Sequence, residues 1–277
     1  MSYAMMPTQA LAMVPGWSGA AATITELPGG LTNRSFRIDH AGECLVLRLD
    51  SEYTGILNLD RKTELSVLET ASVSGLAPEI VYSDARQGIL LSRFIAGGTW
   101  RVQDLAVSAN IEALGALLRR VHALPSSGVS FDAQAIASHY TDNLCSHANL
   151  HAFAKRCEQI IAGIPGPAVS SCCHNDLVLE NLIGSPRPML IDWEYACDND
   201  PLFDLASLIG YHDLQEPIVA GLLEAYAGER ADEFCVRLDI QLHLYDALQW
   251  LWLANRQIIS PDDSQAVRLK ELQQRIR

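Results

Sequence analysis

CHNDLVLEN, residues 173–181, and LIDWEY, residues 190–195, are the two stretches that decide how this sequence is interpreted. The first holds Asp176 and, five residues later, Asn181, while the second is an apolar run that ends in Asp192. An acidic turn followed by a buried strand would account for any one of these residues. The ordered set favours a functional site, because each member sits where a loop, a turn or a strand end would place it.

Phosphoryl transfer from ATP requires such a set. One carboxylate orients or deprotonates the attacking hydroxyl, and an Asn and a second carboxylate hold magnesium against the phosphates. The pattern H-x-D-x-x-x-x-N followed by I-D-W-E has the order that protein kinases use. Asp176 is therefore the candidate catalytic carboxylate, and Asn181 and Asp192 are the candidate magnesium ligands. We expect His174 to orient the loop through hydrogen bonds rather than to act as a base.

The composition is that of an ordinary globular protein. The chain has 277 residues, of which 49% are hydrophobic and 19% are charged. Its net charge of -13 disfavours nonspecific binding to nucleic acid or anionic lipid and mildly favours cationic small molecules. No uninterrupted apolar run approaches the roughly 20 residues of a membrane helix. Neither a nucleic acid nor a membrane is therefore an expected partner.

The cysteines and the N-terminus favour a cytoplasmic protein. Seven Cys are present, an odd count without framework spacing, and a bridge between the adjacent Cys172 and Cys173 would be strained. We therefore expect reduced thiols. A zinc site is not expected, because there is no C-x-x-C pair and the His residues are scattered. Residues 1–15 have no Lys or Arg ahead of their apolar part, which disfavours a secretory signal.

The chain up to about residue 95 predicts a small sheet with one main helix. Short runs of β-branched and aromatic residues, bounded by turn residues, predict the strands, and the spacing of Leu59, Leu65 and Leu68 predicts the helix. Strands are expected at residues 23–27, around Phe36 and Ile38, and at 44–49, 80–82 and 89–95; turns at 29–30 and 39–42; helices at 1–17 and 58–74.

From about residue 104 the pattern changes to helices. Ile111, Leu114, Leu118 and Val121 have helical spacing, and Pro125 follows the expected end of that helix. Further helices are expected at residues 133–150, at 152–161 and at several places beyond 203. Only two short strands are expected here, at 169–173 and 189–191.

These two halves predict an α+β, two-lobed fold like that of protein kinases. A small antiparallel sheet with its helix makes an N-terminal, ATP-binding lobe at residues 1–95. A helical C-terminal lobe at residues 96–277 carries the catalytic loop and the acceptor site, after a short link near residues 96–98. ATP is expected in the cleft between the lobes, because ligand sites favour domain interfaces.

The segment GGLTNRSF, residues 29–36, lies between two expected strands. A Gly-Gly hairpin turn is its simplest explanation. Small residues also let backbone N–H groups approach phosphate oxygens closely, and two hydroxyls can donate as well. Its place ahead of the other ATP elements favours a phosphate loop. The candidate ATP-binding residues of this segment are Gly30, Leu31, Thr32, Asn33 and Ser35.

Arg48 ends the apolar run at residues 45–47, and a lone cation that faces into a strand bundle needs a partner. Kinases use a strand cation to hold the α- and β-phosphates and a helix Glu to hold that cation. Glu64, on the following helix, is the candidate holder, and an ordinary surface ion pair is the alternative. An Arg can bind phosphate bidentately. Ser92 and Phe94 are expected near the adenine, which backbone groups would recognise.

Several other residues have two possible roles. Asp204 begins an apolar helix, so we expect it to cap that helix and also to brace the catalytic loop. Asp198 and Asp200 are expected to be solvated turn residues rather than ligands, with a contact of one of them to a cationic substrate as the alternative. Trp250 and Trp252 belong to an apolar helical stretch in which aromatics usually pack in the core. At this spacing they cannot share one helix face, so at least one is expected to look into a cleft.

The motifs resemble those of the choline/ethanolamine kinase family, within the wider aminoglycoside-phosphotransferase-like kinases. The resemblance implies MgATP-dependent transfer to a small hydroxyl compound, with Asp176 as the base. The chain departs from the family at Leu179, where Gly or Pro is common, and in the spacing of its late Trp pair. The matching segments are residues 29–34, 46–48, 118–122, 173–176 with Asn181, 190–195, 199–201 and 203–206.

Choline or ethanolamine is the acceptor that the resemblance implies, and the acidic residues that follow Asp192 agree with a cationic alcohol. Another small alcohol, such as thiamine or an amino sugar, remains an alternative. A nucleotide-binding pseudokinase is a third, against which the intact catalytic and metal residues argue. The residues expected to line the acceptor site are Glu194, Tyr195, Trp252 and Trp250.

Overall fold

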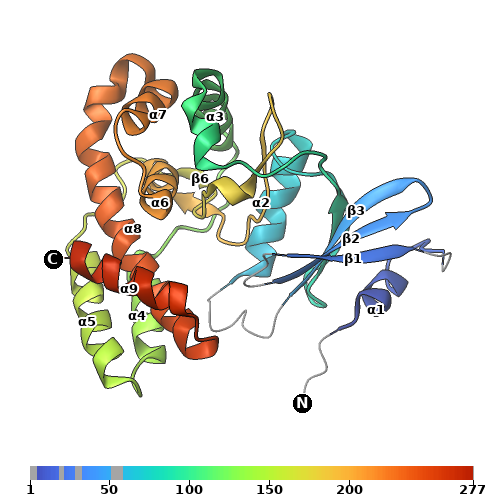
Figure 1. Ribbon diagram of the computed structural model, residues 1–277, viewed down its shortest axis with the longest axis horizontal. Helices are drawn as coiled ribbons and strands as arrows, with labels where there is room; N and C mark the ends of the chain where they lie inside the picture. Colours follow the sequence, from blue (N-terminus) through green and yellow to red (C-terminus); the bar gives the residue numbers. More distant parts are fainter. Residues whose placement is uncertain (1–4, 19–21, 29–32, 51–58, 277) are drawn as a thin grey trace.

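The computed structural model describes residues 5–18, 22–28, 33–50 and 59–276. An antiparallel sheet lies at one end of the molecule, and a larger group of helices lies at the other (Figure 1). The α+β, two-lobed fold that the sequence predicts is confirmed. We call the sheet with helices α1 and α2 the small lobe, and the chain from residue 99 onward the large lobe.

Five strands make the sheet of the small lobe, in the order β1-β2-β3-β5-β4. Each expected strand is present, although β2 runs on to His40, so the hairpin turn contains only Ala41 and Gly42. Both turn residues have positive φ, as tight hairpin turns require. The strands are β1 (Thr23–Leu27), β2 (Asn33–His40), β3 (Glu43–Asp50), β4 (Ile80–Asp84) and β5 (Ile89–Arg93).

The two faces of the sheet have different roles. Alternate residues of β3, Leu45, Leu47 and Leu49, are buried on the face that α1 (Pro7–Ala12) covers. Because side chains alternate along a strand, Arg48 must lie on the opposite face, toward the large lobe. The helix expected at residues 1–17 is much shorter as described, and residues 1–4 lie outside the described part of the chain.

Helix α2 (Arg61–Val73) joins the two lobes. It begins where the side chain of Asp60 accepts hydrogen bonds from the backbone of Lys62 and Thr63. Farther along, Val67, Leu68 and Ala71 pack into the same hydrophobic core as the helices of the large lobe. The helix therefore fixes the small lobe against the large one, and the division of the chain at residue 95 stays a prediction.

Helices dominate the large lobe, and α6 lies against α8 at its centre (Figure 1). The helix expected at residues 133–150 begins at residue 133 as predicted but ends early, because the chain turns after residue 143, which keeps Leu144 buried and lets α5 pack beside α4. The helices are α3 (Ser108–Val121), α4 (Ala133–Asn143), α5 (Ala148–Ala162), α6 (Leu202–His212), α7 (Ile218–Ala227), α8 (Ala231–Ile259) and α9 (Asp263–Arg275), with single 3-10 turns η1 (Val102–Ala106), η2 (Leu179–Asn181) and η3 (Gly228–Arg230).

Four short strands, rather than the expected two, interrupt these helices. Strand β6 (Ser171–Cys173) pairs with β9 (Cys197–Asn199), and β7 (Leu182–Ile183) pairs with β8 (Met189–Leu190). Strands of two or three residues carry too little periodicity to be seen in a sequence. The two pairs nevertheless matter, because the segments that carry the candidate site residues lie between and beside them.

The link between the lobes is itself held by the large lobe. Trp100 is buried, its backbone N–H donates to the Leu182 carbonyl, and its indole donates to the Gly184 carbonyl at 2.8 Å. Trp100 therefore packs against the large lobe. Within the described residues, none of the helices has both the length and the apolar character needed to cross a bilayer.

Candidate active site

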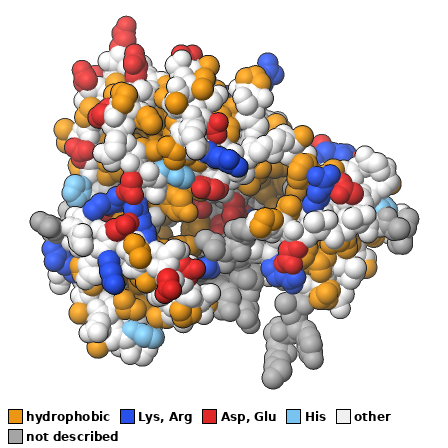
Figure 2. Space-filling view, viewed as in Figure 1, with side chains coloured by type: hydrophobic (Ala, Val, Ile, Leu, Met, Phe, Trp, Pro, Cys, Tyr) orange, Lys and Arg blue, Asp and Glu red, His pale blue; other side chains and the backbone are white. Residues whose placement is uncertain are grey.

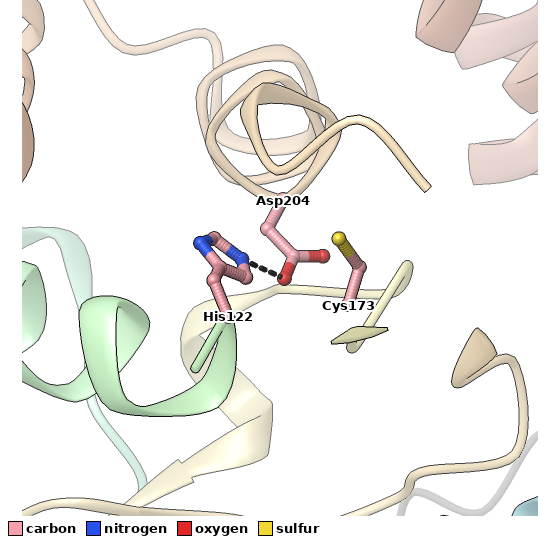
Figure 3. A group of neighbouring side chains, drawn as sticks. All are labelled: His122, Cys173 and Asp204. Atoms are coloured by element: carbon pink, nitrogen blue, oxygen red, sulfur yellow. Dashed lines mark hydrogen bonds and ion pairs between the residues drawn. The ribbon is translucent and has the colours of Figure 1, made fainter. Parts of the chain in front are cut away.

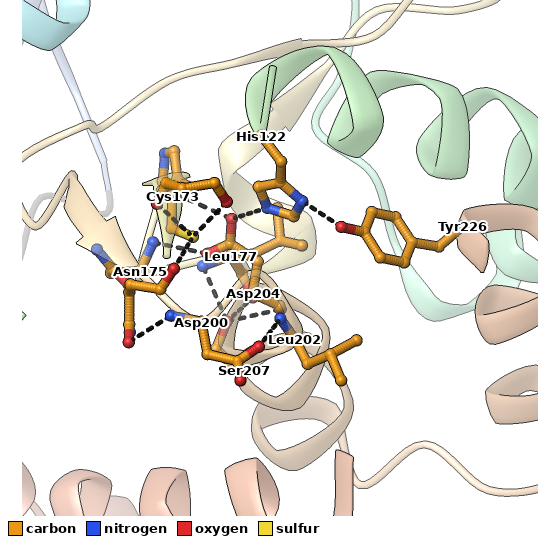
Figure 4. Close-up of polar contacts among 12 residues, drawn as sticks. His122, Cys173, Asn175, Leu177, Asp200, Leu202, Asp204, Ser207 and Tyr226 are labelled. Atoms are coloured by element: carbon orange, nitrogen blue, oxygen red, sulfur yellow. Dashed lines mark hydrogen bonds and ion pairs between the residues drawn. The ribbon is translucent and has the colours of Figure 1, made fainter. Parts of the chain in front are cut away.

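The catalytic loop, residues 174–181, is fastened to helix α6. Asp204 is fully buried in the first turn of α6, and its carboxylate accepts hydrogen bonds from the backbone N–H groups of His174 at 3.0 Å and Asn175 at 2.7 Å (Figure 4). Burial disfavours the ionised form of this carboxylate. The hydrogen bond from His122 and that from the His174 backbone outweigh this effect and lower the pKa of Asp204 below its usual range. Asp204 lies inside the helix, so the expected N-cap is wrong; Pro201 occupies that position.

Two more residues of α6 continue this attachment. The Ser207 hydroxyl accepts from the Leu177 N–H and donates to the Leu177 carbonyl, both at 3.1 Å. The Leu179 N–H donates to His212 Nε2 at 3.0 Å. The backbone conformation around Leu179 is therefore set by a helix residue, although the loop lacks the Gly or Pro that is common in the family.

His122, Cys173 and Asp204 meet behind the loop (Figure 3). Their donor atoms are close enough together to hold a metal ion, but each already has a partner. His122 bridges Asp204 at 2.9 Å and the Tyr226 hydroxyl at 2.8 Å. Burial raises the pKa of the Cys173 thiol, which donates to backbone carbonyls. The group is therefore a brace for Asp204 (Figure 4).

His174 ties the catalytic loop to the segment that carries Asp192. The side chain is fully buried, and Nε2 donates to the Ile191 carbonyl at 2.9 Å. Burial lowers the pKa of this imidazole, which favours its neutral form. A buried neutral ring bonded to backbone cannot take a proton from an acceptor in the cleft, and its position is that of an orienting residue.

The three residues expected to carry the chemistry lie together. The Asn181 side-chain amide donates to the Asp176 carbonyl at 3.0 Å and to its carboxylate at 3.4 Å, so the amide oxygen is the atom that can bind a metal. The Ile191 N–H donates to the Asn181 carbonyl, which brings Asp192 beside the loop. Asp192 has a positive φ, a conformation that Asp tolerates better than most residues and that clusters at functional sites.

The carboxylates of Asp176, Asp192 and Glu194 lie close together and repel one another. Burial and the neighbouring Glu194 carboxylate raise the pKa of Asp176 to about 7, against a smaller lowering by Asn181. Burial and Glu194 also raise the pKa of Asp192 well above its usual range. The Asp192 side chain is still 35% exposed. Several oxygen atoms and a surplus of negative charge therefore surround a position that solvent can reach. Such a position suits a magnesium ion, which Asn181 and Asp192 would hold.

Arg48 projects from β3 toward these carboxylates. One guanidinium nitrogen lies 2.5 Å from Glu64 and 3.5 Å from Asp192. Burial opposes ionisation of Glu64, but Arg48 and Arg61 together lower the pKa of that carboxyl below its usual range. This is the arrangement of a strand cation held by a helix Glu. Because Arg48 faces Asp192 across the cleft, a phosphate beside the metal would come within its reach.

A second guanidinium in the cleft, that of Arg61, was not predicted from the sequence. It binds Glu64 at 2.8 Å in its own lobe and Glu194 at 3.1 Å in the large lobe. The Asn33 side chain donates to the same Glu194 oxygen at 2.8 Å. Arg61 stands three residues before Glu64 in the first turn of α2, which places both on one helix face and was the available signal.

A cavity of about 270 Å³ opens beside Asp176. Figure 2 shows acidic side chains in a hollow between the two lobes. The cavity lining combines carboxylates with aromatic rings. Its lining includes Phe131, Tyr140, Asp176, Asn181, Asp192, Glu194, Tyr195, Phe203, Tyr211, Tyr245, Gln249 and Trp252.

The two late Trp residues have different surroundings. Trp252 lines the cavity, and its indole N–H donates to the Tyr195 hydroxyl at 2.9 Å, which fixes the orientation of both rings. Trp250 is 1% exposed and packs on Phe153 in the core. The expectation that Trp250 lines the acceptor site is therefore wrong, because two residues along a helix turn the side chain about 200° away.

Two further expectations are corrected. Asp198 is buried and accepts hydrogen bonds from the backbone and hydroxyl groups at residues 126–128. Asp200 is 3% exposed and forms an ion pair with Arg237 at 2.8 Å. Neither is a solvated turn residue, because each satisfies donors from another segment. Both are structural supports of the loop that leads into α6.

Of the expected nucleotide residues, Ser35 and Ser92 lie on the cleft side of the sheet, since they pair in register with Arg48 and Val46. Phe94 lies under the Arg37 guanidinium at 4.8 Å. Gly30, Leu31 and Thr32 fall outside the described residues, so their role stays a prediction.

Comparison with known proteins identifies the family and supports the fold. A model of the phosphotransferase enzyme family (APH) matches residues 23–237. Protein LicA of Haemophilus influenzae is 28% identical over 243 residues, which cover 81% of this chain and 70% of that protein. A choline/ethanolamine kinase family protein from Mesorhizobium loti has a similar structure (TM-score 0.73, 25% identity, 97% and 92% of the two chains). The choline kinase LicA from Streptococcus pneumoniae shares the fold (TM-score 0.76, 22% identity, 92% and 93%).

The raised pKa values of Asp176 and Asp192 predict that magnesium binding releases protons. A divalent cation binds the ionised carboxylates, so metal binding must displace the protons that repulsion retains near neutral pH. Affinity should therefore rise with pH through the range around the Asp176 pKa of about 7. Calorimetry in two buffers of different ionisation enthalpy, at about pH 6 and about pH 8, measures the release. Equal affinity at the two pH values, with no proton release, would rule out this charge crowding.

Proposed function

Because the chain belongs to the phosphotransferase enzyme family, as a small-molecule kinase that resembles choline and ethanolamine kinases, we propose that it transfers the γ-phosphoryl group of MgATP to the hydroxyl of a small cationic amino alcohol. Choline and ethanolamine are the leading acceptors. One observation carries this proposal: Asp176, Asn181 and Asp192 lie at the wall of an aromatic cavity, with Arg48 facing Asp192 from the other lobe.

The residues divide the reaction among them. The oxygen of the acceptor hydroxyl forms a bond to the γ-phosphorus, and Asp176 accepts the proton of that hydroxyl. The bond between the γ-phosphorus and the β–γ bridging oxygen breaks, so ADP leaves. Arg48 holds phosphate oxygens in place, and Glu64 fixes Arg48. Asn181 and Asp192 would hold magnesium, which neutralises charge on the transferring phosphates. His174 keeps the Asp176 loop and the Asp192 segment in register.

We expect ATP to bind on the side of the site that the sheet of the small lobe forms. Ser35, Arg48 and Ser92 share the cleft face of the small lobe. Residues 29–32, the expected phosphate loop, precede Asn33, which contacts the large lobe through Glu194. These positions support ATP between the lobes, with its phosphates pointing toward Asp192 and its adenine toward the last strand of the sheet.

The acceptor cavity supports a cationic alcohol. Its lining combines the carboxylates of Asp176, Asp192 and Glu194 with the rings of Tyr195 and Trp252. A cation on the face of a Trp gains about 0.5–2 kcal/mol, and more when water is excluded. Since about 1.4 kcal/mol corresponds to tenfold in affinity, such contacts are enough to favour an ammonium alcohol over a neutral sugar.

A panel of kinase assays tests the proposal. Purified protein with MgATP should phosphorylate choline or ethanolamine faster than thiamine, aminoglycosides or neutral sugars. Asp176→Asn is the matched control, because it removes the base but keeps the shape. It should lower turnover by about 10²–10⁴-fold and leave MgATP binding nearly unchanged. Faster turnover of thiamine or an amino sugar would show that the proposed acceptor is wrong. A fully active Asp176→Asn enzyme would show that Asp176 is not the base.

The two late Trp residues give a matched pair of variants. Trp252→Ala should raise the acceptor KM about tenfold without changing the KM for ATP, because this ring lines the acceptor cavity and not the sheet side of the cleft where ATP is proposed. Choline should be affected more than ethanolamine, since a trimethylammonium cannot donate hydrogen bonds. Trp250→Ala should instead lower the free energy of unfolding by about 3–5 kcal/mol. Denaturant unfolding and steady-state kinetics separate the two effects, and an acceptor KM that changes only in the Trp250 variant would reverse the assignment.

A further inference from the structure

Arg61 contacts more charged and polar partners than the proposed chemistry requires. Its guanidinium donates to Asp50 at 2.9 Å and Glu64 at 2.8 Å within the small lobe. It also donates to Asn33 at 2.6 Å and to Glu194 at 3.1 Å. These contacts reach β2, β3 and α2 on one side of the cleft and the I-D-W-E segment on the other.

The bridge between the lobes is buried. The Arg61 side chain is 10% exposed and that of Glu194 is 3% exposed. Both charges have lost most of their water, so each depends on its partners, and removal of one partner is far more costly than at an exposed ion pair. By contrast, Arg93, which pairs with Glu43 and Glu79 inside the small lobe, is 45% exposed.

The two ends of the bridge have defined places in the sequence. Asn33 immediately follows residues 29–32, the expected phosphate loop, and it bonds both Arg61 and Glu194. Glu194 stands two residues beyond Asp192, the expected metal ligand. Arg61 therefore connects the strand that leads out of the nucleotide loop to the segment that presents the metal ligand.

We propose that Arg61 is a positioning residue that holds the nucleotide-binding strands of the small lobe in register with the Asp192 segment, through Asn33 and Glu194. This inference rests on the proposed function for the identity of the nucleotide. Among the contacts of the described residues, Arg61 touches neither the acceptor cavity nor the side chains of Asp176, Asn181 and Asp192. Its effect reaches the nucleotide through Glu194 and Asn33, and Arg48 remains the residue that holds the phosphates.

The alternative role is local. Asp50 and Glu64 alone could anchor Arg61 to the small lobe, and the contact with Glu194 would then add nothing to nucleotide binding. The two roles differ in one measurable respect. If Arg61 acts across the cleft, its contribution to MgATP binding requires the Glu194 carboxylate; if it acts locally, that contribution is the same whether or not the carboxylate is present.

A double-mutant cycle separates them. The MgATP dissociation constant is measured by calorimetry for wild type, Arg61→Met, Glu194→Gln and the double variant. We expect Arg61→Met to weaken MgATP binding about tenfold in the wild-type background and less than about threefold in the Glu194→Gln background. The same weakening in both backgrounds, or a lower melting temperature with unchanged MgATP binding, would overturn the proposal.

Three features keep this test decisive. Arg93→Met is the matched control, since it removes a small-lobe Arg with two carboxylate partners and should leave MgATP binding unchanged. If Arg61→Met does not fold, Arg61→Lys completes the cycle, because an ammonium keeps the charge but cannot reach four partners at once. The cycle needs no acceptor, so a failed acceptor panel with an intact cycle refutes only the proposed function.

Discussion

Buried negative charge in the cleft is the constraint on which the rest of the structure depends. Two guanidinium groups, Arg48 and Arg61, meet more carboxylates than they can neutralise. A carboxylate that loses water without gaining a counter-charge is costly, so partial burial and mutual repulsion raise the pKa of Asp176 and Asp192. The carboxylates within this group are Asp50, Glu64, Asp176, Asp192 and Glu194.

Such a cluster must be held rigidly if it is to remain useful. Helix α6 supplies that rigidity to the catalytic loop through Asp204, Ser207 and His212, while His174 joins the loop to the strand before Asp192. On the other side of the cleft, α2 holds Arg48 through Glu64 and shares the core of the large lobe. The site therefore combines strained and repelling groups with a scaffold that over-determines their positions.

The sequence predicted what is local and missed what depends on distant partners. The strands of the small lobe were predictable because their alternation is clear, and Asp176, Asn181 and Asp192 because their order along the chain reflects their chemistry. Arg61 was missed, since its spacing to Glu64 indicates only a shared helix face, and its partners Asn33 and Glu194 are distant in sequence. Asp198 and Asp200 seemed solvated because their donors lie elsewhere. Trp250 and Trp252 could be told apart only once the helix face that meets the cavity was known.

Calorimetry of ATP binding with and without magnesium tests this account most directly. If the carboxylates of the cleft require a cation, ATP in the presence of a chelator should bind at least about tenfold more weakly than MgATP, because its phosphates meet uncompensated negative charge. The dependence should disappear in Asp192→Ala, which removes a metal ligand and part of the repulsion. Equal affinity of the wild-type protein for ATP and MgATP would contradict the account.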